Sequence, residues 1–456
     1  MSPRVRTATG GLALVLALVL AIGAATGNAR PGGSAQPTSS APGAIADGPG
    51  QAPGASASPA EPPSKTEQMI ATMQGRLKAN PNDVVAYGTL GEAYLQRTRE
   101  TGDPSYYGKA QAVFESALQR DPHNLEALIG EGSLALSRHE FQLALELGER
   151  ALTENRTVAR IFGIIGDAQV ELGQYDAAVS TIQRMVDLRP DLSSYSRVSH
   201  LRELYGDLDG AIAAMQTAAQ EGGPVSENTE YVRAQLGYLY WTKGDLADAE
   251  RTFTESLTRL PDYIQALGGL ARVRVSQGRL ADAIELYRRA VAQIPLPDFV
   301  IGLGEALQAS GQTAEANHQY ELVRAIEQLF AANGVATDLE LALFEADHGT
   351  DPAAALALAR SAYAHRPNIR AADALAWALF KTGDVRSAVR YSAEALRLGT
   401  KDPILLYHAG IIERAAGNLR VARQRLTECL ALNPVFNPLA APVARRILTA
   451  LGGPVS

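Results

Sequence analysis

The sequence predicts an all-α fold, a right-handed α-solenoid of about ten helical hairpins with a capping helix at each end. The composition is the first indication: of 456 residues, 46% are hydrophobic but only 6% are aromatic, so buried surface must come mainly from small and aliphatic side chains, which suit packed helices. The second is a frame of small and apolar residues that recurs about every 34 positions. Repeats of this length stack into one continuous superhelix, so the three domains that the length suggests are not expected.

Residues 1–29 have the three-part layout of a secretory signal peptide. Arg4 and Arg6 precede an uninterrupted apolar run over 12–22, and small residues follow this run. We therefore expect an exported protein whose signal peptide is cleaved near Ala29. The alternative is that the segment is retained as an N-terminal membrane anchor, which would be the only route of membrane attachment.

Residues 30–64 are predicted to form a disordered tether. Of these 35 residues, 28 are Pro, Gly, Ser or Ala, and Ile45 is the only large apolar side chain. Such a segment cannot bury enough surface to offset the chain entropy lost on folding. The tether would hold the folded body away from the cell envelope.

One small-residue position marks each predicted hairpin between residues 81 and 434. It is occupied by Ala110, Ala144, Ala178, Ala211, Ala249, Ala283, Ala316, Ala355, Ala388 and Ala422. A Gly usually lies about five positions before this Ala, and a large apolar residue lies four positions after it. The Gly ends a first helix, and the small residue lets a second helix pack closely against it.

The clearest copy of the hairpin is residues 231–261. In this copy Gly237 and Ala249 would bring the two helices together, and Gly244 would end the first of them. Phe253 is expected to fill the seam between this hairpin and the next one.

The repeat resembles the tetratricopeptide repeat, which has an aromatic-Leu-Gly-Tyr first helix and an Ala-Phe-Ala-Pro second helix. The first copy carries this pattern in Tyr87, Leu90, Gly91, Tyr94, Ala110, Phe114, Ala117 and Pro122. The resemblance covers residues 81–434 and is good in seven or eight of ten copies, although Ser199 and Leu343 stand where two copies should have Gly. Lone amphipathic helices within 65–80 and 435–456 are interpreted as caps on the exposed ends of the superhelix.

Three places break the period of the repeat. Seven extra residues lie around 98–105, four near 222–224 and five near 333–334. Since insertions at hairpin junctions are usually tolerated as loops, we expect surface loops there.

The residue inventory argues against catalysis and against a nucleic-acid partner. The chain has no GxSxG elbow, phosphate-binding glycine loop or HExxH pair, so we expect neither an enzyme nor a bound cofactor. The 42 basic and 49 acidic residues give a net charge of −7, and no basic cluster suits a phosphate backbone. Cys429 is the single cysteine, which excludes an intramolecular disulfide, and it is expected to be a buried apolar residue.

The resemblance implies a concave groove, lined by the first helices, that binds an extended peptide or a partner protein. Carrying the family's groove positions onto this sequence selects Tyr231, Tyr238, Trp241, Arg272, Arg370, Trp377 and Phe380. Exposed aromatic and Arg side chains are typical anchors of such a site. The alternative for both tryptophans is that each ring lies under a neighbouring hairpin. The Lys and Asn side chains with which some family members clamp a C-terminal carboxylate are missing, because Gly88 and Glu92 stand at those positions.

Two rival functions remain open. Asp347 and His348 lie near Glu340 and Glu345, which suggests an accessory protein that handles a small molecule or a metal ion. A metal site needs three or four convergent ligands, whereas an adjacent Asp and His at a helix end more often form a cap. The third hypothesis is an enzyme with a site hidden in the irregular eighth copy.

Overall fold

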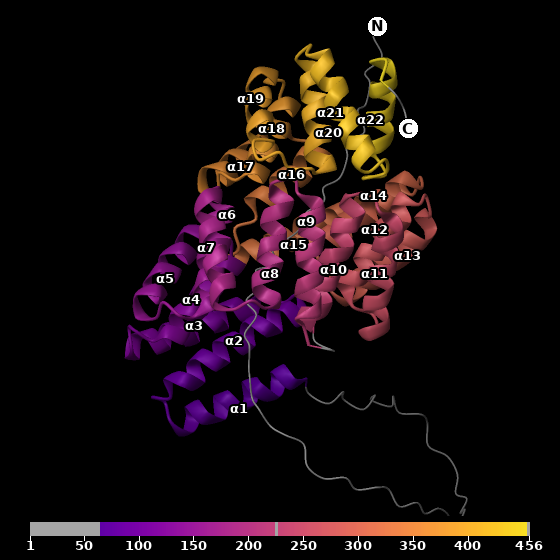
Figure 1. The fold of residues 1–456 in the computed structure, drawn as a ribbon. Helices are drawn as coiled ribbons and strands as arrows, with labels where there is room; N and C mark the ends of the chain where they lie inside the picture. Colours follow the sequence, from indigo (N-terminus) through magenta and orange to yellow (C-terminus); the bar gives the residue numbers. More distant parts are fainter. Residues whose placement is uncertain (1–63, 224–226, 454–456) are drawn as a thin grey trace, which may run out of the picture.

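The computed structural model describes residues 64–223 and 227–453, so the predicted signal peptide and almost all of the predicted tether lie outside the described residues. The described residues form 22 helices and no strand, which confirms the all-α prediction (Figure 1). In chain order the helices are α1 (Lys65–Ala79), α2 (Val84–Thr101), α3 (Ser105–Arg120), α4 (Leu125–Ser137), α5 (Phe141–Glu154), α6 (Ala159–Glu171), α7 (Tyr175–Leu188), α8 (Leu192–Leu204), α9 (Leu208–Gln220), α10 (Glu227–Thr242), α11 (Leu246–Arg259), α12 (Ile264–Ser276), α13 (Leu280–Gln293), α14 (Pro297–Ala309), α15 (Thr313–Ala332), α16 (Asp338–His348), α17 (Pro352–His365), α18 (Ile369–Lys381), α19 (Val385–Ala395), α20 (Pro403–Ala415), α21 (Leu419–Leu432) and α22 (Ala440–Ala450).

Ten helical hairpins, from α2/α3 to α20/α21, form the body of the molecule, and we number them repeats 1 to 10. Each first helix packs against the second helix of its own hairpin, and each second helix packs against the first helix of the next hairpin. This is the packing of a solenoid, as the sequence predicts. At the two ends, α1 packs on α2 and α22 packs on α21.

The marker alanines explain why the hairpins pack so closely. All ten are completely buried, because each lies at the contact of the two helices of its repeat. Phe253 fills the seam between repeats 5 and 6, since a methyl group on either Gly237 or Gly269 would collide with its ring. The expected role of Phe253 is therefore confirmed.

The insertions in repeats 1 and 7 lengthen helices, so the expectation of surface loops at these two places was wrong. Most first helices have 13 residues, but α2 has 18, and α15, a second helix, has 20. The sequence has no helix-ending residue until Gly102 in the first case and the Asn333-Gly334 pair in the second. The helices therefore continue by one or two turns before they end.

Turns from the first half of the superhelix lie directly against junctions from the second half. The turns inside repeats 1 to 5 contact the chain just after repeats 6 to 10, through Gly102 with Ile294, His139 with Ala336, Gly173 with Pro367, Gly206 with Gly399, and Gly244 with Leu432. Hydrogen bonds across these contacts join residues 192 to 197 positions apart. In Figure 1 the orange and yellow helices of the last repeats lie over the purple and magenta helices of repeats 3 to 5.

Side-chain amides hold these two superhelical turns together. The Asn368 amide donates to the carbonyl and the carboxylate of Glu171, at 3.2 and 2.9 Å. The Asn433 amide donates to the carbonyl of Trp241 at 2.7 Å. The superhelix is therefore closed on itself along its axis, with one turn stacked on the other. Among the residues of 64–223 and 227–453, no helix has the length and apolarity that a membrane span requires.

Candidate functional site

Both tryptophans selected for the groove are buried. Trp241 is 2% exposed and donates its indole N–H to Ser276 Oγ at 2.9 Å. Trp377 is 1% exposed and donates to Asp347 Oδ1 at 2.8 Å. Each ring lies under a neighbouring hairpin, which is the alternative that the sequence left open. In this conformation neither ring is available to a partner.

The closure of the superhelix explains part of this burial. The carbonyl of Trp241 accepts the hydrogen bond from Asn433, so the second superhelical turn covers the end of α10. The Trp377 ring stacks on the His408 ring, with centroids 4.1 Å apart, and on the Phe380 ring at 5.1 Å. A structural role accounts for both tryptophans.

Four of the other selected residues keep part of their surface exposed: Tyr238, Arg272, Arg370 and Phe380. The Arg272 guanidinium lies over the rings of Tyr238 and Trp241, at 5.3 and 5.1 Å from their centroids. The fifth, Tyr231, is only 7% exposed. A partner-binding role for these residues stays a prediction.

An arginine and a carboxylate from opposite sides of the superhelix influence each other across its inner face. Burial raises the pKa of Asp298, on α14, to about 7, although the positive charges of Arg272 and Arg370 oppose the shift. Asp298 Oδ1 accepts no hydrogen bond within the described part of the chain. The charge of Arg370 also reaches Glu203 on α8 and Asp402 on α20. Arg370 itself forms no ion pair with any described carboxylate, so its donors face the interior unneutralised.

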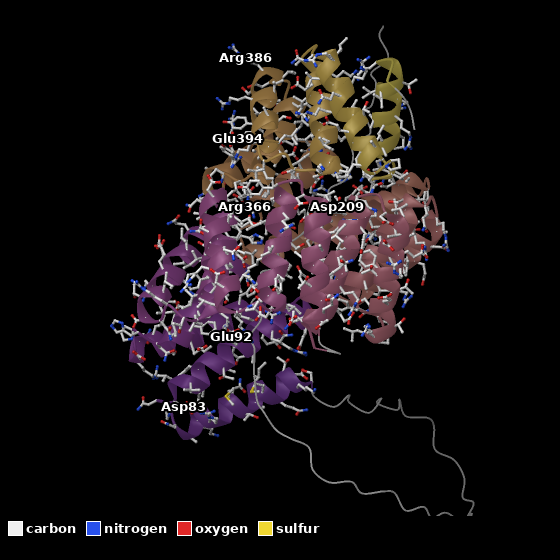
Figure 2. The ribbon with its side chains drawn as sticks, viewed as in Figure 1. Asp83, Glu92, Asp209, Arg366, Arg386 and Glu394 are labelled. Atoms are coloured by element: carbon white, nitrogen blue, oxygen red, sulfur yellow. The ribbon has the colours of Figure 1, made fainter. Side chains whose placement is uncertain are left out.

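Most other charges of the inner face are paired between neighbouring hairpins. The pairs are Arg160 with Glu92 at 2.5 Å, Arg197 with Asp167 at 2.7 Å, Arg366 with Glu340 at 2.6 Å, and His408 with Asp373 at 2.9 Å. Figure 2 shows Arg366 near the boundary between the helices of the first repeats and those of the last repeats. The sequence gives no sign of the Arg366 pair, because Arg366 follows the end of α17 rather than a groove position.

Asp347 and His348 lie in a buried cluster that joins three repeats. His348 Nε2 is 3.3 Å from Glu305 Oε1, and the His348 ring stacks on Tyr320. Burial raises the pKa of both Asp347 and Glu305. No arrangement of three or more His, Cys, Asp or Glu suited to a metal ion occurs among residues 64–223 and 227–453. Cys429 is completely buried, as the sequence predicts.

The family model of the tetratricopeptide repeat matches residues 105–159, 165–226 and 235–296. Among curated proteins, the chain is 23% identical over 218 residues to cellulose synthase 1 operon protein C of Komagataeibacter xylinus, covering 48% of this chain and 14% of that protein. It is 28% identical over 290 residues to cellulose synthase operon protein C of Xanthomonas axonopodis pv. citri (strain 306), covering 60% of this chain and 16% of that protein. The chain therefore matches only a small part of the length of either relative.

Solved structures with the same repeat architecture superpose loosely on the chain. A dimer of human IFIT1 with PPP-AAAA gives a TM-score of 0.46 at 18% identity, covering 72% of this chain and 77% of that one. The APC/C hetero-tetramer Cut9–Hcn1 gives 0.37 at 14% identity, covering 85% and 96%.

Proposed function

Because the chain is a tetratricopeptide repeat protein, we propose that it is an exported, non-catalytic scaffold that binds an extended segment of a partner protein on the inner face of its superhelix. The observation that carries the proposal is the pair Arg272 and Arg370, which reach this face from α12 and α18 and form no ion pair with any carboxylate that the structure describes. Arginine forks suit peptide carbonyls and carboxylates, and they are frequent anchors of protein interfaces.

The partly exposed aromatic rings of Tyr238 and Phe380 support a protein partner. They lie on the same first helices that present the arginines or on the adjacent repeat, so an extended segment would meet alternating apolar and cationic positions. An acidic or C-terminal residue in that segment would complement Arg370. The closed superhelix favours a segment that enters along the axis over a folded domain.

The non-catalytic part of the proposal rests on the absence of sequence motifs for nucleophilic, metal-dependent or nucleotide-dependent chemistry. The exported part rests on the signal-like residues 1–29. Sequencing the mature N-terminus in an extracytoplasmic fraction tests the second part, with a start near Arg30 expected.

Site-specific photo-crosslinking in intact cells tests the binding face. A photoreactive amino acid at Phe380, on the inner face, should capture a partner that the same group at the exposed Arg259, on α11, does not. For the captured protein, Arg370→Gln should weaken binding by about tenfold or more, because a charged hydrogen bond of the complex is lost.

Arg259→Gln is the matched control, since it removes the same charge from an outer helix. Equal crosslinking from both positions, or equal affinity of the Arg370→Gln and Arg259→Gln proteins, would remove the inner face from the proposed function.

A further inference from the structure

The three breaks in the repeat period, which are far apart in the sequence, meet at one cavity of about 330 Å³. The lengthened end of α2 contributes Thr98 and Arg99, and Glu227 begins α10 just after the second break. The lengthened end of α15 and the segment after it contribute Phe330 and Thr337. Loops that are merely tolerated have no reason to converge, so a shared cavity indicates a common role.

The stacking of the two superhelical turns creates this cavity. The turn of repeat 1 lies on the junction after α13 through Gly102 and Ile294, and the turn of repeat 2 lies on the junction after α15 through His139 and Ala336. Both contacts border the cavity, since Gly102, Ile294 and His139 line it. The site therefore exists only in the closed superhelix.

Aromatic and aliphatic side chains form much of the wall. Tyr107, Tyr231, Tyr263 and Phe330 line the cavity together with Leu95 and Val335. A volume of this size with mainly apolar walls and a few polar groups is typical of a site for a small organic molecule. Tyrosine rings also attract a cation placed over their faces.

Negative charge predominates among the ionisable groups of the wall. The carboxylates are Glu100, Glu227, Asp262, Glu327 and Glu340, and the basic groups are Arg99 and His139. Three of the carboxylates already have a partner: Glu100 pairs with Arg97, Asp262 with Arg289, and Glu340 with Arg366. Glu227 accepts a hydrogen bond from Tyr263 Oη at 3.0 Å, and the charge of Arg99 acts on it.

Glu327 is the carboxyl group of this wall that lacks a counter-charge. It is 5% exposed and forms no ion pair with any basic side chain that the structure describes. Burial raises its pKa to about 8; the negative charges of Glu340 and Asp298 add to the shift, while the Thr337 hydroxyl opposes it. A buried carboxylate without a partner is costly, and a cation in the cavity would supply that partner.

We propose that this cavity binds a small organic cation, an ammonium group on an aromatic or aliphatic body, with Glu327 as its counter-charge and the tyrosine rings around it. The site is separate from the inner-face scaffold role, because neither Arg272 nor Arg370 lines the cavity.

Calorimetry with three probes of one shape tests the proposal on the intact protein. Phenethylammonium should bind, and 2-phenylethanol and 3-phenylpropanoate, which replace the ammonium by a hydroxyl and a carboxylate, should bind at least about tenfold more weakly. Glu327→Gln should reduce phenethylammonium affinity by about tenfold or more, since Gln keeps the shape and hydrogen bonding but cannot ionise. Glu321→Gln, at an exposed position of the same helix, should leave the affinity unchanged.

Circular dichroism of both variants establishes that they remain folded. Three results would overturn the proposal: no binding of phenethylammonium up to about 10 mM, unchanged affinity in Glu327→Gln, or equal binding of all three probes. Tighter binding of 3-phenylpropanoate would assign the cavity to anions through Arg99 and would also overturn it.

Discussion

Two buried acids make the stability of this protein depend on pH near neutrality. Burial raises the pKa of Glu327 to about 8 and that of Asp298 to about 7. Such acids hold protons in the folded protein that they release when the chain unfolds. Their contribution to stability is therefore complete below the ordinary carboxyl pKa, and it is lost as the pH rises toward the folded value.

Glu327→Gln should remove part of this pH dependence. We expect the variant to gain stability relative to the native protein as the pH rises from 5 to 8, by about 2 kcal/mol or more, because Gln never has to ionise. Urea unfolding at the two pH values measures the difference. The exposed Glu321→Gln should show the same small effect at both, and an identical gain for Glu327→Gln at pH 5 and pH 8 would contradict the expectation.

At the same scale, the tryptophans show how a correct position can have a different role. Trp241 and Trp377 stand at groove positions of the repeat, yet their indole N–H groups donate to Ser276 and to Asp347, both within the folded chain. A repeat position specifies which helix face a residue occupies. It does not specify how far the next hairpin covers that face.

At the scale of single elements, the glycine turns inside the repeats fall into two groups. Gly206 and Gly383 occupy the same place in their hairpins, and both have positive φ, at 73° and 91°. A side chain on Gly206 would collide with the carbonyl of Gly399 on the other superhelical turn, whereas Gly383 has nothing within 4 Å. The first group of turns is thus part of an interface.

Gly206→Ala and Gly383→Ala separate the two costs. Each change should destabilise the protein by about 1 kcal/mol because Ala disfavours a left-handed backbone. Gly206→Ala should cost clearly more, since it also forces the stacked turns apart. Thermal unfolding compares the two, and small-angle scattering should show an enlarged radius of gyration only for Gly206→Ala. Equal losses with unchanged dimensions would argue against stacking of the turns in solution.

The insertions illustrate a second property of the elements. Additional residues at 98–105 lengthen α2, and those before Asn333 lengthen α15, because nothing in either segment ends a helix sooner. Helices extended beyond the common length project from the repeat stack. Their ends therefore reach the other superhelical turn and contribute to the cavity there.

At the scale of the whole molecule, closure of the superhelix should contribute measurably to stability. Asn368 and Asn124 both cap a helix through their side chains, at 2.8 and 3.0 Å from the amides of Ala371 and Ala127. Asn368 also donates to Glu171 of the other superhelical turn.

Asn368→Ala and Asn124→Ala should each lose about 1 kcal/mol from the helix cap. Asn368→Ala should lose roughly a further 1–2 kcal/mol, because Glu171 loses a buried donor. Chemical denaturation of the two variants measures this excess. An equal loss for both would mean that the contact between the turns contributes nothing.

The sequence by itself determined the repeat: its period of about 34 residues, the buried alanines, the glycine turns and the ring of Phe253 between hairpins. These features depend on interactions within a hairpin and with its nearest neighbour, and such interactions leave a regular pattern in the chain. The sequence also selected the inner-face residues, although it could not tell which of them stay exposed.

Only the tertiary structure decided that the superhelix closes on itself, that both tryptophans are covered, and that three distant insertions meet at one cavity. The contacts responsible join residues 192 to 197 positions apart. Their register depends on the rotation between successive repeats summed over five repeats, so small differences at each junction accumulate. No local pattern carries that sum, and it determines which faces of this protein can bind a partner.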